Sequence, residues 1–259
     1  MTTVTRLIEM MNRLRDPVRG CPWDREQDFK SILVFTLEEA YELAEAIDRG
    51  DLHSVRDELG DLLFHLVFYA KLGEEAGAFD FADIVEGVVD KLERRHPHVF
   101  ADEQPLSAAD QNRLWERRKA ADRRRKNPTG QGFLAGIPEA LPALARAGKL
   151  QSRAAAAGFD WPALPPVLAK LEEEIAEFRQ AVDGGEPEER LEEEIGDLLF
   201  SVVNVARHAG IDPEAALRVA NRKFMERFGG VEQELAARGK LPEQATLEEM
   251  DAIWQSLKS

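Results

Sequence analysis

The sequence predicts an all-α protein that consists of two tandem, duplicated helical-bundle modules. Three observations support this prediction: apolar residues recur at helical spacing, no stretch shows the sustained alternation of apolar and polar residues typical of strands, and one segment occurs twice. Residues 59–64 read LGDLLF, and residues 195–200 read IGDLLF. At 259 residues, the chain is long enough for two domains that each bury a core.

The repeat extends well beyond this segment. Asp61 and Asp197 are 197 − 61 = 136 positions apart, and Glu39 and Glu174 are 174 − 39 = 135 positions apart. Between the copies, residues 127–142 contain three prolines and three glycines, a composition that breaks helices. We therefore predict an N-terminal module at 1–126, a linker at 127–142 and a C-terminal module at 143–259.

The elements follow from periodicity and turn signals. Residues 1–15 have apolar residues at helical spacing with charges between them, which predicts an amphipathic helix rather than a signal peptide. Turns at 48–51 and 183–187 each separate two helices, which predicts one antiparallel helix pair in each module. The helix after the first turn is apolar nearly all round, so we place it at the centre of a four-helix bundle that a partner chain could complete. Its main apolar stripe is Leu59, Leu62, Leu63, Leu66, Val67 and Ala70.

Charge and composition limit the partners. Lys plus Arg number 34 and Asp plus Glu number 49, which gives a net charge of -15. This field disfavours nucleic acid and anionic membranes as partners, and a small phosphorylated substrate would need a metal ion. The longest apolar run, 62–70, is too short for a membrane span. The single cysteine, Cys21, fits a reducing cytoplasm and is expected to be a packed thiol. A basic cluster within 117–126 is interpreted as a solvated helix or an interdomain contact.

Each module carries two acidic pairs with i, i+3 spacing, one before the turn and one after it. Residues three apart share a helix face, so the two pairs can face each other across the hairpin. Asp61 and Asp197 lie inside otherwise apolar helices, where an unpaired carboxylate is costly. Oxygen ligands favour Mg²⁺ or Mn²⁺. The predicted metal ligands are Glu39, Glu42, Glu58 and Asp61 in the first module and Glu174, Glu177, Glu194 and Asp197 in the second.

Two alternatives to this metal site are a structural ion-pair network and a di-iron centre. Di-iron bundles use Glu-x-x-His pairs. Here His65 follows Asp61 at i+4, and Ser201 takes its place in the second copy, so histidine ligation is not repeated. The helical glycines Gly60 and Gly196 are expected where a facing helix approaches closely.

Basic and aromatic residues recur as well. Lys91 and Arg95, like Lys223 and Arg227, share one helix face and could hold outer phosphates, or they could complement the helix dipole. Trp254 could stack on a base, or it could anchor the packing of a short C-terminal helix. The equivalent residues in the first copy are Trp115 and Lys119, which match Trp254 and Lys258.

Six segments resemble the MazG family of nucleoside triphosphate pyrophosphohydrolases, in its two-module bacterial form, across nearly the whole chain. They are residues 20–24, 36–42, 58–64, 91–100, 158–161 and 192–197. The resemblance implies the all-α NTP pyrophosphatase fold and a homodimer. It also implies cleavage of a nucleoside triphosphate to the monophosphate and pyrophosphate, and we expect broad base specificity because stacking tolerates every base.

The resemblance assigns site residues as well. The eight carboxylates match the family's Mg²⁺ ligands, and Glu174 or Glu177 is a candidate base. The triphosphate contacts carry over to Lys223, Arg227 and Trp254, and Arg190 stands where a lysine is common. Two-module members often rely on the C-terminal copy, yet both carboxylate sets are intact here. The alternative is a regulatory module that binds nucleotides without hydrolysing them.

Overall fold

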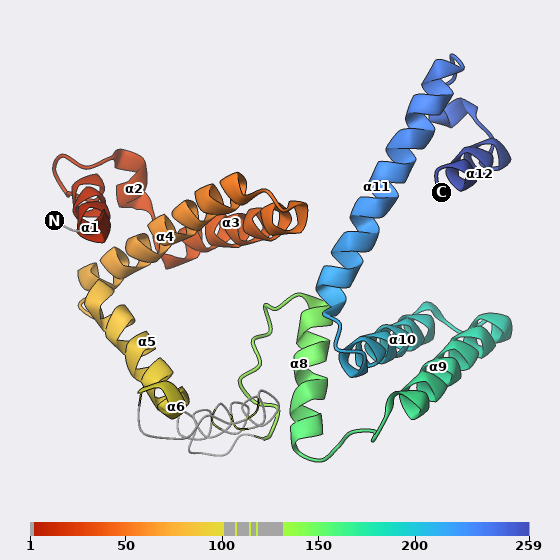
Figure 1. Cartoon of the computed structure of the whole chain (residues 1–259), viewed down its shortest axis with the longest axis horizontal. Coiled ribbons are helices and arrows are strands. Elements are labelled where there is room, and N and C mark those ends of the chain that lie inside the picture. Colours follow the sequence, from red (N-terminus) through yellow and green to blue (C-terminus); the bar gives the residue numbers. More distant parts are fainter. Residues whose placement is uncertain (1–2, 101–106, 108–113, 115–117, 119–131, 259) are drawn as a thin grey trace. The chain divides into compact units, whose positions relative to one another are not determined.

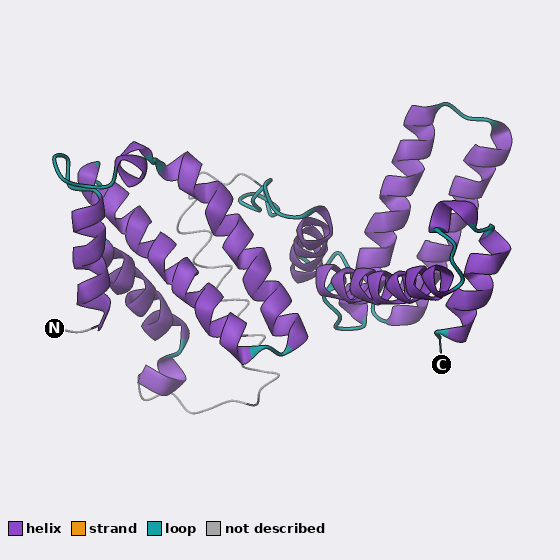
Figure 2. Ribbon diagram, turned by 90° about the horizontal axis from the view of Figure 1, so that it is seen from above, coloured by secondary structure: helices purple, strands orange, loops and turns teal. Residues whose placement is uncertain are grey.

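A computed structural model describes residues 3–100, 107, 114, 118 and 132–258 of the chain. In this part of the chain the regular elements are helices, and there is no strand (Figure 2). The chain divides into two compact units, Met1–Lys126 and Asn127–Ser259, and each is described by itself. Among the described residues, no helix combines the length and apolar character that crossing a membrane requires.

The first unit is built around an antiparallel hairpin of two long helices, α3 and α4 (Figure 1). The turn between them lies where the sequence predicts it, because Gly50 adopts a left-handed conformation at φ 70° and Asp51 caps the next helix. Asp28 and Asp80 cap α3 and α5 in the same way. The helices are α1 (Thr3–Leu14), α2 (Pro22–Glu26), α3 (Phe29–Arg49), α4 (Leu52–Glu75), α5 (Phe81–Arg95) and α6 (Pro97–Phe100).

The core of the first unit lies where α1 packs against the C-terminal half of α4. Its buried residues are Met11, Ile32, Val67, Phe68 and Leu72. Part of the predicted stripe is not covered by the described part of the chain, since Leu59 and Leu66 are 51% and 52% exposed. One face of the hairpin therefore exposes apolar side chains among the described residues.

The second unit repeats the hairpin as α9 and α10. Gly185, at φ 66°, makes the turn within the predicted segment. Figure 1 shows α11 leading away from this hairpin and α12 folding back beside its far end. Val231, Leu235 and Ile253 form a buried cluster between α11 and α12. The elements are α8 (Ala143–Ala156), α9 (Leu164–Gly184), α10 (Glu188–His208), α11 (Pro213–Ala237), the 3-10 helix η1 (Pro242–Gln244) and α12 (Leu247–Ser256).

In each unit a charged contact ties the loop after the first helix to the end of the hairpin's second helix. In the first unit, Arg15 Nε donates to Glu75 Oε1 at 2.9 Å, and this bond lowers the pKa of Glu75. In the second unit, Arg207 NH1 donates to Asp160 Oδ2 at 3.0 Å, and the hydrogen bonds from Arg207 lower the pKa of Asp160. His208 contacts the same carboxylate. The charges are reversed between the two contacts: the loop supplies the cation in the first unit and the anion in the second.

Two single residues of the first unit, Cys21 and His65, were noted in the sequence. Cys21, expected to be a packed thiol, is free and partly buried at the N-cap of α2. His65 is buried in α4, and its Nδ1 atom has no hydrogen-bond partner among the described residues. Burial lowers the pKa of His65, while the nearby Asp61 acts in the opposite direction.

Candidate functional site

Three of the predicted ligands in the first module come together across the α3–α4 hairpin. Glu39, Glu58 and Asp61 each offer a carboxylate oxygen, and these oxygens lie within 4.8 Å of one another. Burial raises the pKa of Glu39, and the neighbouring charges of Asp61, Glu42 and Glu58 raise it further. Glu42 is exposed and lies outside the close group. These carboxylates crowd negative charge into a small volume.

The second module repeats this arrangement with deeper burial. Oxygens of Glu174, Glu194 and Asp197 also lie within 4.8 Å of one another. Glu174 and Glu194 are only 6% and 2% exposed, whereas Asp197 is exposed. Glu177 is exposed and lies outside the close group, as Glu42 does. The antiparallel return of α10 along α9 therefore brings the two acidic pairs together, as their spacing suggests.

Both groups have the composition and spacing that a hard divalent cation requires. All the donors are carboxylate oxygens, which suit Mg²⁺ or Mn²⁺. Two opposite oxygens of an octahedral Mg²⁺ site lie about 4.2 Å apart, given Mg–O distances of about 2.1 Å. The 4.8 Å limit within each group is close to that separation. Small side-chain adjustments would complete such a site.

A lysine not identified from the sequence lies beside the second group. Lys170 Nζ lies 2.7 Å from Glu173 Oε1 and 3.0 Å from Glu174 Oε1. The hydrogen bonds to Glu173 and Glu174 raise the pKa of Lys170. Its i, i+4 spacing from Glu174 is the signal that could have identified it, although such pairs are common on acidic helices.

On α10, Arg190 contacts Glu194 as Lys170 contacts Glu174 on α9. Its NH1 atom donates to Glu193 Oε2 at 2.6 Å, and its NH2 atom forms an ion pair with Glu194. The contacts with Glu193 and Glu194 raise the pKa of Arg190. Each buried carboxylate of the second group therefore has a cation of its own.

Apart from Arg190, the predicted phosphate-binding residues of the second module lie on different elements from the carboxylates. Arg227 lies over the ring of Trp254 at 5.7 Å, and Phe224 contacts the same ring. Trp254 also packs against the α11–α12 core, as the packing interpretation expects. Lys223 is exposed on α11. Among the described residues, no ion pair or ring contact joins this cluster to the carboxylates of α9 and α10.

The first-module counterparts are only partly described. Lys91 and Arg95 are partly buried on α5. The Arg95 carbonyl accepts a hydrogen bond from Arg118 NH1 at 2.9 Å. Trp115 and Lys119 lie outside the described residues, as does most of the basic cluster within 117–126.

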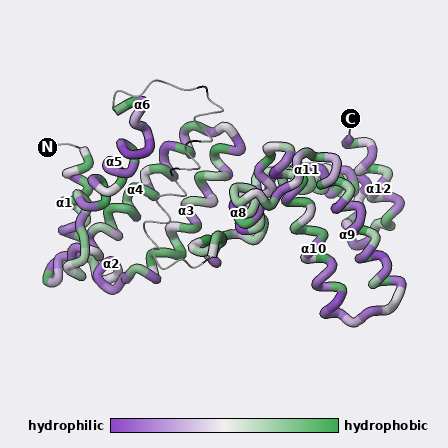
Figure 3. The backbone as a smooth tube through the Cα atoms, turned by 90° about the horizontal axis from the view of Figure 1, so that it is seen from below, coloured by the Kyte–Doolittle hydropathy of each residue, from purple (hydrophilic) through white to green (hydrophobic). Residues whose placement is uncertain are grey.

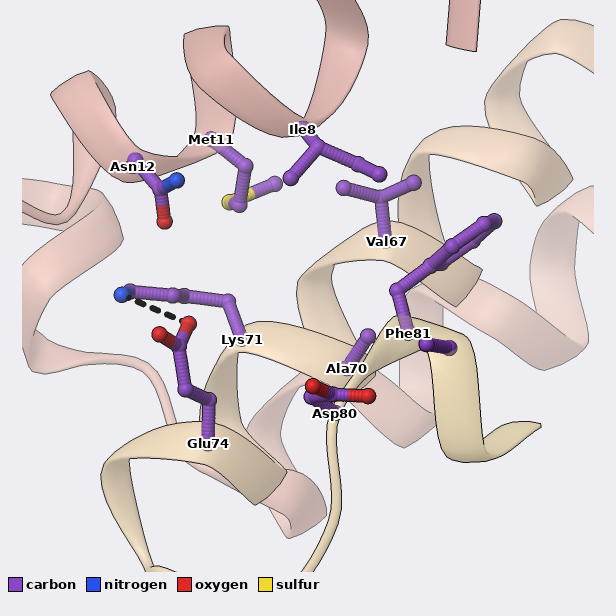
Figure 4. A pocket seen from close by; sticks show the side chains of 10 residues that line it. Ile8, Met11, Asn12, Val67, Ala70, Lys71, Glu74, Asp80 and Phe81 are labelled. Atoms are coloured by element: carbon purple, nitrogen blue, oxygen red, sulfur yellow. Dashed lines mark hydrogen bonds and ion pairs between the residues drawn. The ribbon is translucent and has the colours of Figure 1, made fainter. Parts of the chain in front are cut away.

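A cavity of about 300 Å³ in the first unit lies apart from the acidic group. Figure 4 shows Ile8 and Met11 of α1 facing Val67 of α4, and the ion pair between Lys71 and Glu74 at one side. None of the predicted ligands or phosphate contacts lines this cavity. It adds no residue to the candidate site.

The glycines beside the ligands face open space within the chain. A Cβ atom built on Gly60 or Gly196 would meet no described atom within 4 Å, other than its own helix and neighbours. The close approach expected at these glycines therefore does not occur within the described part of the chain. Figure 3 shows hydrophobic residues along α3 and α4. In the second hairpin, Ile195 and Leu199 are also exposed.

Comparison with known proteins places this geometry in a family. The model of the MazG nucleotide pyrophosphohydrolase domain matches residues 27–100 and 166–231, one match for each hairpin. A nucleoside triphosphate pyrophosphohydrolase of Escherichia coli strain K12 is 50% identical over 262 residues, covering 100% of this chain and 98% of that protein. A nucleoside triphosphate pyrophosphohydrolase/pyrophosphatase MazG of Thermotoga maritima is 42% identical over 252 residues, covering 97% of this chain and 94% of that protein.

Among solved structures, a mazG-related protein from Thermotoga maritima matches 44% of this chain and 97% of its own, with 29% identity and a TM-score of 0.38. The two family matches and the full-length similarity to curated relatives agree with the duplicated sequence and the two helical hairpins. The chain belongs to the MazG nucleotide pyrophosphohydrolase family.

Proposed function

We propose that this chain hydrolyses nucleoside triphosphates to the nucleoside monophosphate and pyrophosphate, with Mg²⁺ held in the second module. The observation that carries the proposal is the group of Glu174, Glu194 and Asp197, two of them buried, within a matched family segment. The names of the full-length relatives support the substrate class. The modules proposed are 1–126 and 143–259, with a linker at 127–142.

We assign different roles, metal binding and proton acceptance, to different side chains of the second hairpin. Glu174, Glu194 and Asp197 would hold the ion, and a bound Mg²⁺ would neutralise the phosphates and favour attack by water. Glu177 is exposed one helical turn from the buried Glu174, so it can reach solvent. We therefore favour Glu177 over Glu174 as the base that accepts the proton from water.

The cations of the second unit would bind the substrate. Arg190 lies beside the carboxylate group, and Lys223 and Arg227 share a face of α11. Guanidinium groups suit phosphate oxygens because they donate two parallel hydrogen bonds. Trp254 offers a partly exposed ring for a base, and stacking does not discriminate strongly between bases. We therefore propose broad base specificity.

A homodimer is part of this proposal. Leu59, Leu66 and Leu199 leave apolar surface uncovered on the two hairpins, and Gly60 and Gly196 leave room for close approach. A second copy that packs on these faces would complete four-helix bundles. It could also bring the Lys223 and Arg227 cluster of one subunit toward the carboxylates of the other.

The test is product analysis with purified protein, Mg²⁺ and a panel of nucleoside triphosphates. We expect monophosphate and pyrophosphate in equal amounts, values of kcat/KM that differ by less than about tenfold between bases, and loss of activity with a chelator. Diphosphate and orthophosphate as first products would contradict the reaction. Nucleotide binding without turnover would favour the regulatory alternative.

A further inference from the structure

The two carboxylate groups differ in the residues that stand four positions, about one helical turn, before two of their glutamates. In the second module, Lys170 precedes Glu174 by four positions and Arg190 precedes Glu194 by four, and both cations form ion pairs with these ligands. Lys170 and Arg190 are 35% and 47% exposed, whereas the carboxylates they contact are almost fully buried. Each cation therefore reaches inward from the surface.

The first module has no cation at either equivalent position. Four residues before Glu39 stands Phe35, which makes an edge contact with Trp23 at 5.8 Å between ring centroids. Four residues before Glu58 stands Ser54, whose hydroxyl donates to Asp51 Oδ2 at 2.8 Å as part of the helix cap. Among the described residues, no lysine or arginine forms an ion pair with the carboxylates of this group.

This difference changes the charges that an incoming divalent ion meets at each carboxylate group. In the second group, the ion must compete with two cations that already compensate the carboxylates and that repel it. In the first group, the ion meets carboxylates that repel one another and have no ion-paired cation among the described residues. The two carboxylate groups are similar, but among the described residues a divalent ion competes with bound cations only in the second group.

We propose that Lys170 and Arg190 are internal counter-cations that control metal loading, so that the first module binds a divalent ion at lower concentration than the second. This proposal rests on the proposed metal sites. Lys170 and Arg190 act as positioning residues in this role, because they act through the carboxylates rather than on the reacting atoms. Once displaced, Arg190 is available for the phosphate role proposed above.

The experiment titrates the full-length protein with Mn²⁺ and follows free Mn²⁺ by electron paramagnetic resonance. In a background in which Glu58→Gln and Asp61→Asn disable the first group, the titration reports on the second group alone. Adding Lys170→Met and Arg190→Met should tighten Mn²⁺ binding roughly tenfold, the combined effect of two modest ion pairs. Lys170→Arg with Arg190→Lys keeps both charges and should leave the affinity near that of the background.

Two further variants separate this effect from general destabilisation. Arg238→Met removes another i, i+4 cation of the same unit, the partner of Glu234 on α11, and should not change Mn²⁺ affinity. Phe35→Lys, in the otherwise unaltered first module, adds a counter-cation and should weaken binding there by a few-fold. The Phe35→Lys change is made in a protein in which Glu194→Gln and Asp197→Asn disable the second group.

The outcomes are distinct. Unchanged affinity in the Lys170→Met, Arg190→Met protein, with the fold intact by circular dichroism, would overturn the counter-cation proposal and leave the metal sites standing. If that protein does not fold, the Phe35→Lys titration decides, and unchanged affinity there overturns the proposal. Absence of Mn²⁺ binding in both single-site backgrounds and in the unmodified chain would overturn the metal sites and this proposal together.

Discussion

The hairpins α3–α4 and α9–α10 both turn at a left-handed glycine, and both gather three carboxylates from corresponding positions. One turn before these glutamates the two hairpins differ, with Phe35 and Ser54 in the first and Lys170 and Arg190 in the second. The comparison teaches that a duplicated site can change its electrostatics while keeping every carboxylate. The residues that differ sit on the same helices, where substitution leaves the backbone plan unaltered.

The largest expected difference between the hairpins is in catalysis. Glu194→Gln with Asp197→Asn should lower kcat/KM for pyrophosphate release by roughly 100-fold or more, because neutral amides cannot offset a divalent ion. Glu58→Gln with Asp61→Asn should lower it only a few-fold. Both proteins should keep their helical circular dichroism. If the first-module pair were the more damaging, the assignment of catalysis to the second module would be reversed.

Metal-linked stability gives the next effect. An ion that binds only the folded state stabilises it by about 2.7 kcal/mol when present at a hundred times its Kd, which is a shift in Tm on the order of 10 °C for a module of this size. Calorimetry with and without Mg²⁺ should show this shift for both modules. Disabling one carboxylate group should remove the shift from its own module alone, and a loss from both would show that the groups are coupled.

Substitutions in the two ion pairs at the hairpin ends, Arg207–Asp160 and Arg15–Glu75, should have a smaller effect on stability. Asp160→Asn should destabilise the second unit by about 1–2 kcal/mol, because it weakens charged hydrogen bonds from Arg207 and His208. Glu75→Gln should cost about 1 kcal/mol or less, since the Glu75 side chain is more exposed, at 35% against 25%. Equal losses from the two variants would remove this distinction.

The pH dependence of this effect follows from the direction of the pKa shifts. Arg207 holds the pKa of Asp160 below its ordinary value of 3.8, so its stabilisation is fully present above that pH. The stabilisation is lost as the pH falls through the lowered pKa. Urea unfolding at pH 7 should therefore separate Asp160→Asn from the wild type, and the two should converge in strong acid. A gap that widens in acid would contradict the assigned cause.

The smallest effect concerns Gly60 and Gly196. Alanine at either position should stabilise the isolated subunit by about 0.5–1 kcal/mol, because no described atom of the chain would contact its Cβ. If a second copy packs against these glycines, the same substitution should shift sedimentation toward the monomer. A stabilised protein with an unchanged association constant would place the dimer contact elsewhere.

The fold and part of the site could be predicted from the sequence because both depend on local signals. Gly50 and Gly185 marked the hairpin turns, and the all-α duplicated fold is confirmed. The i, i+3 spacing and the antiparallel return were sufficient to bring Glu174 and Asp197 together with Glu194. These features depend on backbone periodicity alone.

Other features could not be predicted because they depend on side-chain choice or on surfaces beyond one chain. Lys170 was missed since an i, i+4 pair with glutamate is common on any acidic helix, and only the burial of Glu174 distinguishes it. The bundle-centre position predicted for Leu59 and Leu66 is not reached within the described part of the chain, because periodicity shows that a face is apolar without showing what covers it. The ligand roles of all eight carboxylates stay predictions, and Glu42 and Glu177 lie outside the two close groups.

The opposite polarity of the two end contacts has a consequence for folding. Tandem copies of one hairpin are prone to exchange elements during synthesis, when the first copy emerges before the second. An exchange that set the loop of the first module on the second hairpin would place Arg15 near Arg207 and His208. The reverse exchange would place Asp160 near Glu74 and Glu75. Like charges would meet in both misassembled forms, so each hairpin would repel the loop of the other module.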